Sequence, residues 1–118
     1  MSYLTRYATR ALGGVRLLPG VRVDEYTRLN RPGFYGDAFV RVFVEDTSRR
    51  NPRRELPEPK LRLRIADCTN VINLEFSVES EADRENSLFK IDTLLAALER
   101  FRDGLRAEAE LYAERERH

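Results

Sequence analysis

The sequence has few of the side chains on which most catalytic and metal sites depend. Its 118 residues include one histidine, His118 at the last position, one cysteine, Cys68, and no tryptophan. Acid–base catalysis usually relies on a well-positioned histidine, and a chain end positions a side chain poorly. A nucleophilic cysteine needs an activating neighbour, and a zinc site needs several histidine or cysteine ligands. We therefore expect no enzymatic activity, no metal site and no cofactor.

Long apolar runs and cysteine pairs are also missing. No run approaches the roughly 18 apolar residues that a membrane-spanning helix requires. The single cysteine cannot form an internal disulfide, which fits a reducing compartment. We therefore expect a soluble, cytoplasmic protein with no membrane partner, and the length predicts one domain over residues 1–118.

Charge, by contrast, is abundant and unevenly distributed. Charged residues make up 35% of the chain. Residues 1–65 hold 14 basic and 7 acidic side chains, whereas residues 66–118 hold 7 basic and 13 acidic ones. Such separation is typical of an anionic partner for the basic part or of head-to-tail self-association. It also fits two segments that simply complement each other within the chain.

Alternating apolar and polar residues predict an antiparallel sheet over residues 21–79. The clearest strand is about 35–46, where Val40, Val42 and Val44 alternate with aromatic and charged side chains. The other expected strands are 21–28, 60–66 and 71–79.

A basic loop interrupts this pattern at residues 47–59. It contains three prolines and four arginines, which oppose regular pairing and favour a long solvated connection. We expect the loop to add phosphate contacts through Arg49, Arg50, Arg53 and Arg54.

One uninterrupted helical pattern follows the sheet, from Ser80 to Arg117. Apolar residues recur at three- and four-residue steps between Leu88 and Leu105. Ser80 is a suitable N-cap, with Asp83 in the capping-box position. The spacing also allows a short helix over residues 2–12. The predicted fold is α+β: a four-stranded antiparallel meander sheet packed on one long C-terminal helix.

If the apolar strand residues face that helix, the opposite face of the sheet is basic and aromatic. Cations that follow phosphates and rings that stack on bases are typical of single-strand binding. Glu45, Glu75 and Glu79 are expected on the same face and would weaken a phosphate track. The candidate binding residues are Arg22, Tyr26, Arg28, Phe39, Arg41, Phe43, Lys60, Arg62 and Arg64.

We therefore expect a non-enzymatic protein that binds single-stranded nucleic acid or another phosphate-rich anionic ligand. The order of elements, four strands and then a helix, resembles that of the Whirly and Pur-type single-strand binders, although no sequence motif of either family is present. Three alternatives stay open. In the first, the face binds a small ligand such as a nucleotide. In the second, its arginines are ordinary surface residues and the N-terminal segment covers Phe39 and Phe43. The third is a small oligomeric protein-interaction module, an adaptor or inhibitor of a host protein of the phage or mobile-element type.

Self-association is also expected. The apolar stripe of the helix is wider than one sheet contact needs, and residues 106–117 extend beyond the length of a sheet. These features predict a homo-oligomer, most simply a dimer, with Phe89, Leu111 and Tyr112 at the interface.

Overall fold

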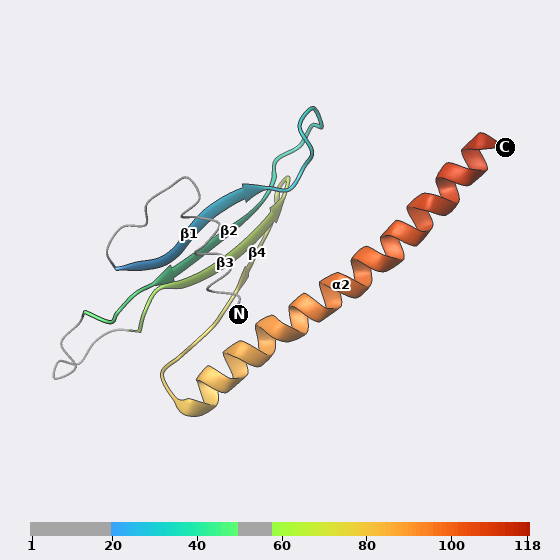
Figure 1. The fold of residues 1–118 in the computed structure, drawn as a ribbon. Coiled ribbons are helices and arrows are strands. Elements are labelled where there is room, and N and C mark those ends of the chain that lie inside the picture. Colours follow the sequence, from blue (N-terminus) through green and yellow to red (C-terminus); the bar gives the residue numbers. More distant parts are fainter. Residues whose placement is uncertain (1–19, 50–57) are drawn as a thin grey trace. The chain divides into compact units, whose positions relative to one another are not determined.

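The computed structural model describes residues 20–49 and 58–118, which form four strands and one long helix (Figure 1). The predicted α+β fold, an antiparallel sheet followed by a C-terminal helix, is confirmed. The expected helix over residues 2–12 lies outside the described residues, as does the loop segment 50–57. The elements are β1 (Val21–Arg28), β2 (Ala38–Glu45), β3 (Leu61–Asp67), β4 (Asn70–Leu74) and α2 (Glu81–Arg117).

The chain divides into two compact units, Met1–Glu79 and Ser80–His118. The first contains the sheet and the second is the helix, and each is described by itself. The packing of the helix on the sheet therefore stays a prediction.

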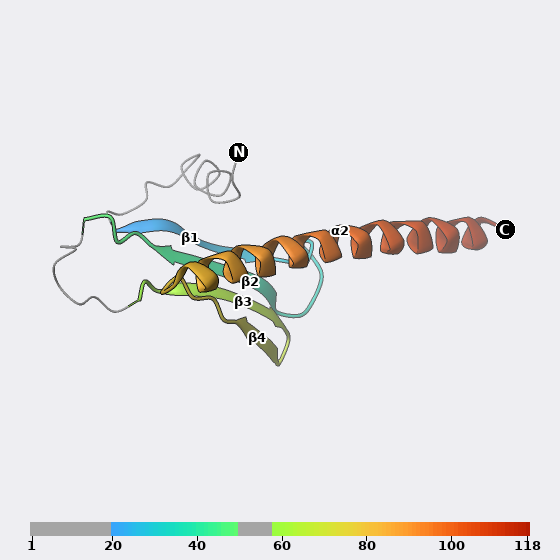
Figure 2. The same ribbon diagram turned by 90° about the horizontal axis from the view of Figure 1, so that it is seen from below.

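The four strands lie in chain order, β1-β2-β3-β4, and every neighbouring pair is antiparallel (Figure 2). This is the predicted meander. Val44 of β2 lies opposite Val23 of β1 and Leu61 of β3. Because facing residues of antiparallel strands point to the same side, these side chains share one face. That apolar face comprises Val23, Val40, Val42, Val44, Leu61, Leu63, Ile65, Ile72 and Leu74.

Burial is uneven across the sheet. Val23 and Ala66 are each only 2% exposed, whereas Ile72 near the outer edge is 60% exposed. The central valines of β2 are half-buried. Glu25 also lies on the apolar face, opposite Val42, where its Oε1 accepts a hydrogen bond from Thr27 at 3.1 Å.

Two strands are shorter than predicted. β2 starts at Ala38 and not near residue 35, because Gly33 and Gly36 have left-handed φ values of 94° and 101°. Those angles are incompatible with an extended strand. The side chain of Asn30 also donates to the carbonyl oxygens of Tyr35 and Gly36, at 3.3 and 3.1 Å, and so stabilises a loop there.

β4 ends at Leu74, five residues before the predicted end. The carboxylate of Glu58 accepts hydrogen bonds from the Ser77 hydroxyl at 2.5 Å and from the Val78 N–H at 3.3 Å. These bonds give the segment after β4 partners outside the strand ladder, so the ladder is not continued.

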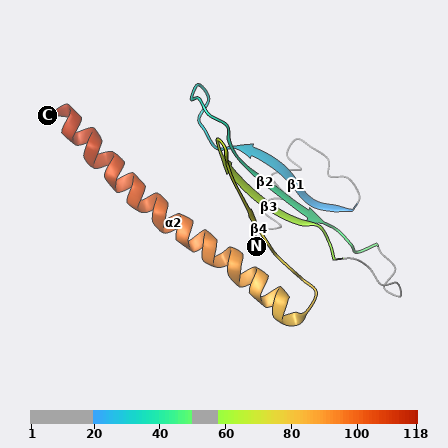
Figure 3. The ribbon, with the colours of Figure 1, turned by 180° about the vertical axis from the view of Figure 1, so that it is seen from behind.

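The β1–β2 loop and the β3–β4 turn meet at one end of the sheet (Figure 3). The N–H of Cys68 donates to the carbonyl of Asp37 at 2.9 Å, which joins the two connections. Cys68 has a φ of 54°, in the left-handed region that is unfavourable for a side-chain-bearing residue. The two-residue turn formed by Cys68 and Thr69 imposes this conformation.

α2 is one uninterrupted helix of 37 residues, about 55 Å long. Ser80 is its N-cap, as predicted, and its hydroxyl accepts from the N–H of Asp83 at 3.0 Å. Acidic Glu81 and Asp83 lie in the first turn and Arg115 and Arg117 in the last, which suits the helix dipole.

The left-handed backbone of Cys68 yields a stability prediction. Cys68→Gly should raise the free energy of unfolding by about 1 kcal/mol, because glycine adopts this conformation without the Cβ penalty. Thr69→Gly is the matched control, since Thr69 has no left-handed φ to relieve, and it should be neutral or destabilising. Urea denaturation followed by circular dichroism measures both. A Cys68→Gly protein that is less stable than wild type would contradict the inference that the backbone of Cys68 is strained.

Candidate anion-binding face of the sheet

The strand register brings seven of the nine predicted binding residues onto one face of the sheet. Arg41 in the centre of β2 lies opposite Tyr26 of β1 and opposite Arg64 of β3. Alternate residues along each strand share that side, opposite the apolar face. We call this surface the arginine face. Its predicted binding residues are Tyr26, Arg28, Phe39, Arg41, Phe43, Arg62 and Arg64, and Asp24, Ala66, Val71 and Asn73 lie on the same side.

Arg41 and Arg64 form the most distinctive pair on this face, because two like charges occupy directly opposed positions. Arg64 Nε donates to Asn73 Oδ1 at 2.9 Å, whereas Arg41 Nη2 lies 3.8 Å from Asp24 Oδ1. Arg41 Nε is buried and has no hydrogen-bond partner among the residues that the structure describes. Opposed like charges destabilise a sheet by up to about 1 kcal/mol. An anion between the two guanidinium groups would replace this repulsion with two attractions.

The flanking rows add two more guanidinium groups. Arg28 is paired with Phe39, and Arg62 with Phe43. Both arginines are exposed, and within residues 20–49 and 58–118 neither has a carboxylate in ion-pair contact. Their charges are therefore available to an anionic ligand.

Aromatic rings lie among these cations. Tyr26 and Phe39 stack with ring centroids 4.8 Å apart and an interplanar angle of 29°. Tyr26 is 51% exposed, and Phe39 and Phe43 are half-buried. Such rings offer flat apolar surface on which a planar base stacks. The predicted alternative, a cover over Phe39 and Phe43 from the N-terminal segment, concerns residues outside the described part.

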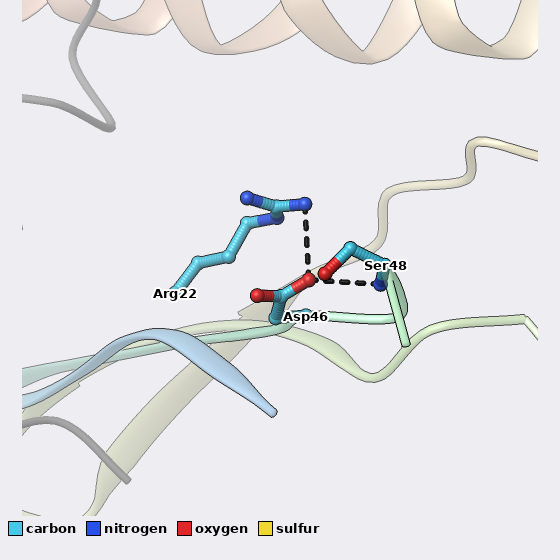
Figure 4. A network of polar contacts seen from close by, with 3 residues as sticks. All are labelled: Arg22, Asp46 and Ser48. Atoms are coloured by element: carbon cyan, nitrogen blue, oxygen red, sulfur yellow. Dashed lines mark hydrogen bonds and ion pairs between the residues drawn. The ribbon is translucent and has the colours of Figure 1, made fainter. Parts of the chain in front are cut away.

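Arg22 has different surroundings from the other candidates, and Figure 4 shows its contact with Asp46. The β1–β2 register shifts between Val21 and Val23, so Arg22 lies at a bulge and outside the regular alternation. Its Nη2 lies 3.1 Å from Asp46 Oδ1, which also accepts from the N–H of Ser48 at 2.9 Å. The charge of Arg22 is thus partly offset by Asp46.

Lys60 precedes β3 and lies beside Glu45, which is two residues after Phe43, the last arginine-face position of β2. Its N–H donates to Glu45 Oε1 at 3.0 Å, and the Glu45 N–H donates to the Lys60 carbonyl at 3.0 Å. Glu45 therefore lies at the margin of the face. β4 ends at Leu74, so the strand alternation does not extend to Glu75 and Glu79, and their expected place on this face stays a prediction.

The basic loop is described only in part. Arg49 lies in the turn after Asp46, while Arg50, Arg53 and Arg54 lie outside the described residues.

The β1–β2 loop carries exposed side chains that the sequence reasoning did not select. Tyr35 is 99% exposed, and Arg31 lies over the ring of neighbouring Phe34 at 5.4 Å. The Phe34 N–H donates to the Arg31 carbonyl at 3.0 Å, which forms a turn. The loop adjoins the row of Arg28 and therefore one end of the arginine face. The signal in the sequence that could have identified these residues is a pair of aromatics directly after a proline-glycine turn.

The three residues predicted for an oligomer interface lie on α2, and all are exposed: Phe89, Leu111 and Tyr112. Arg115 lies over the ring of Tyr112, with its Cζ 5.3 Å from the ring centroid.

No protein-family model, curated protein or solved structure matches this chain. Among the described residues, no helix is both long and apolar enough to cross a membrane, and no group of three or more histidine, cysteine or acidic side chains is placed to hold a metal ion.

The contacts of Asp46 predict a pH dependence. Its pKa lies below the ordinary 3.8, chiefly because of the hydrogen bonds from Ser48 and also because of the positive charges of Arg22 and Arg49. A lowered folded-state pKa means that Asp46 stabilises the fold above its ordinary pKa, and that this stabilisation is lost as pH falls through the lowered value.

An NMR titration of the Asp46 carboxyl carbon should therefore give a midpoint below 3.8. Arg22→Ala should raise the midpoint only part of the way, since the bonds from Ser48 remain. Arg100→Ala on the helix is the control and should leave it unchanged. A wild-type midpoint at or above the ordinary value would contradict the contacts in Figure 4.

Proposed function

We propose that this protein is a non-enzymatic binding protein whose arginine face holds single-stranded nucleic acid. The observation that carries the proposal is the facing pair Arg41 and Arg64, flanked by Arg28, Arg62 and the Tyr26–Phe39 stack. Four guanidinium groups on one face, with one acidic neighbour at 3.8 Å from Arg41, favour a polyanion.

In this proposal the backbone phosphates bind the guanidinium groups. Arginine presents several N–H donors in a planar fork that matches phosphate oxygens. Neighbouring strands are about 4.8 Å apart, so Arg41 and Arg64 are close enough to share one phosphate. Arg28 and Arg62, in the rows on either side, then receive the adjacent phosphates.

The bases occupy the aromatic part of the face. Tyr26 has the most exposed ring of the three aromatics on the arginine face, and stacking on such a ring is tolerant of base identity. Tyr35 and Phe34 of the β1–β2 loop extend the stacking surface at the Arg28 end. The paired bases of a duplex would not offer their faces to these rings, which favours a single strand.

The size of the arginine face favours an oligonucleotide ligand over a free nucleotide. A strand of eight residues is about 27 Å long, and three strands carry the residues of the face. One nucleotide would contact only the central row, whereas several linked nucleotides would contact all three. The loop arginines Arg49, Arg50, Arg53 and Arg54 are proposed to extend the phosphate track, with Lys60 and Arg22 at the margin.

We further propose a cytoplasmic location and a homodimeric state. The exposed free thiol of Cys68 fits a reducing compartment. The exposed apolar side chains of α2 support self-association. The second candidate function, an adaptor or inhibitor of another protein, rests on the same helix, and a stoichiometric, nuclease-resistant protein partner together with no oligonucleotide binding would favour it.

The first test of the arginine face is removal of its central charges. The double variant Arg41→Ala, Arg64→Ala should weaken binding of an oligonucleotide of about 15 nucleotides by at least tenfold, because a shared phosphate contact is lost. The slope of log affinity against log salt should fall by about 1. Fluorescence anisotropy at several salt concentrations measures both.

The control for this variant is Arg100→Ala, Arg117→Ala, which removes the same charge from α2. It should leave both the affinity and the slope close to wild type. Wild-type protein that fails to bind at low salt, or a control variant that weakens binding as much as the test variant, would refute the proposal.

The second test separates stacking from charge. Tyr26→Leu keeps an apolar side chain but removes the ring, and stacking contributes about 1–3 kcal/mol per base. We expect at least a fivefold loss of affinity with an unchanged salt slope. Thr27→Val on the opposite face is the control. Loss of affinity accompanied by a reduced slope would instead indicate that Tyr26 supports the arginines, and unchanged affinity would exclude stacking there.

A further inference from the structure

A regular seam of apolar residues runs along α2. Its positions alternate three- and four-residue steps, the spacing that keeps side chains on one side of paired helices. Seven of the eight positions are apolar and one, Arg102, is charged. The seam comprises Leu88, Ile91, Leu95, Leu98, Arg102, Leu105, Ala109 and Tyr112.

Much of this seam is exposed in the single chain. Leu105 is 58% exposed, and every residue from Leu98 onward is exposed. The seam is about 36 Å long at 1.5 Å per residue, whereas a strand of eight residues is about 27 Å long. A sheet of this size is therefore too short to match the whole seam. Exposed apolar surface of this extent marks an interaction site.

We propose that the seam is the docking site for a second copy of this chain, with the two α2 helices antiparallel and Leu98 opposite Arg102 of the second copy. This proposal does not depend on the arginine face or on its ligand.

The position of Arg102 selects the orientation. In a parallel pair, residues with the same number meet in the same layer, so two Arg102 side chains would face each other in the apolar centre. In the antiparallel pair each Arg102 meets Leu98 and its guanidinium group reaches the edge of the interface. This register matches all eight seam positions, and Leu95 then meets Leu105 of the second copy.

Charges beside the seam favour the same arrangement. Antiparallel helices bring Asp92 beside Arg106 of the second copy. They also bring the two Glu99 carboxylates near each other at the centre, where the Arg102 side chain of each copy lies beside them. A parallel pair would not bring these opposite charges together. The two helix dipoles also oppose each other, which is favourable.

The width of the apolar stripe has an explanation in this pair as well. Phe101 lies next to the seam and is 69% exposed. At the centre of the antiparallel pair, Phe101 meets Phe101 of the second copy, and aromatic pairs stabilise such contacts. Tyr112 lies within the seam, whereas Phe89 and Leu111 lie on the outer side of the helix, so the antiparallel pair does not place these two at its interface.

Solution mass tests whether the second copy binds. Light scattering at tens of micromolar should give the mass of two chains for wild type. Leu98→Glu should give the mass of one chain, because the two introduced carboxylates would lie near the two Glu99 carboxylates at the centre of the pair. Ala107→Glu on the opposite side of the helix is the matched control and should remain a dimer. A single-chain mass for wild type, or equal effects of the two variants, would overturn the proposal.

Disulfide trapping tests the orientation. In a Cys68→Ser background, Leu95→Cys and Leu105→Cys chains of different mass are mixed, equilibrated and mildly oxidised. The antiparallel pair should yield mainly the mixed disulfide between the two variants, and the parallel pair would yield like-with-like products. Predominance of like-with-like products, or no cross-linking beyond that of Ala107→Cys chains, would overturn the antiparallel pair.

These outcomes are separable from those for the arginine face. Leu98→Glu should retain oligonucleotide binding by each chain, and the Arg41→Ala, Arg64→Ala variant should retain the two-chain mass. If the arginine-face variant becomes a single chain, or if the wild-type dimer forms only with added oligonucleotide, the proposal that the seam binds a second copy independently of the arginine face is wrong.

Discussion

The pairing of β2 along both of its edges is the constraint on which the sheet depends. Val42 has Glu25 on one side and Leu63 on the other, and Arg41 has Tyr26 and Arg64. Because side chains alternate with a period of two, a one-residue slip of this strand would exchange its valines with Arg41 and its phenylalanines between the two faces. The apolar face strongly disfavours such a slip. The same hydrophobic pattern that stabilises the sheet therefore fixes the composition of the arginine face.

Alternation was sufficient to predict which residues share a face, because it is a local property of extended chain. The valines of β2 and the arginines of β3 follow it without exception. It could not predict where a strand stops, since that depends on partners distant in sequence. Glu58 accepts hydrogen bonds from Ser77 and Val78 and so ends β4. The bulge beside Val21 displaces Arg22 from the regular alternation of β1. Neither the contact nor the bulge has a signature in the neighbouring residues.

The helix was predicted almost to the residue for the opposite reason. Its start is set by Ser80, whose hydroxyl caps the N–H of Asp83 three residues away, and its periodicity is local throughout. The prediction of the candidate site was less complete than that of the helix. Tyr35 was included in the predicted strand at 35–46, since aromatics favour strands, and Phe34 was assigned to no element. The left-handed conformation of Gly36, which keeps both residues in the loop, is visible only in the structure.

Both candidate surfaces place a charge where stability alone would disfavour it. Arg41 faces Arg64 in the sheet, and Arg102 interrupts the apolar seam of α2. In the proposals each cost is offset by a partner: a phosphate in the first case, and Leu98 with Glu99 of a second chain in the other. If both hold, one dimer carries two arginine faces, and a long single strand that reached both would bind more tightly than one face allows. A free nucleotide has no second contact to gain. The dependence of affinity on ligand length would then be steeper for the dimer than for the Leu98→Glu chain, and this difference would distinguish a polymeric ligand from a nucleotide at the same face.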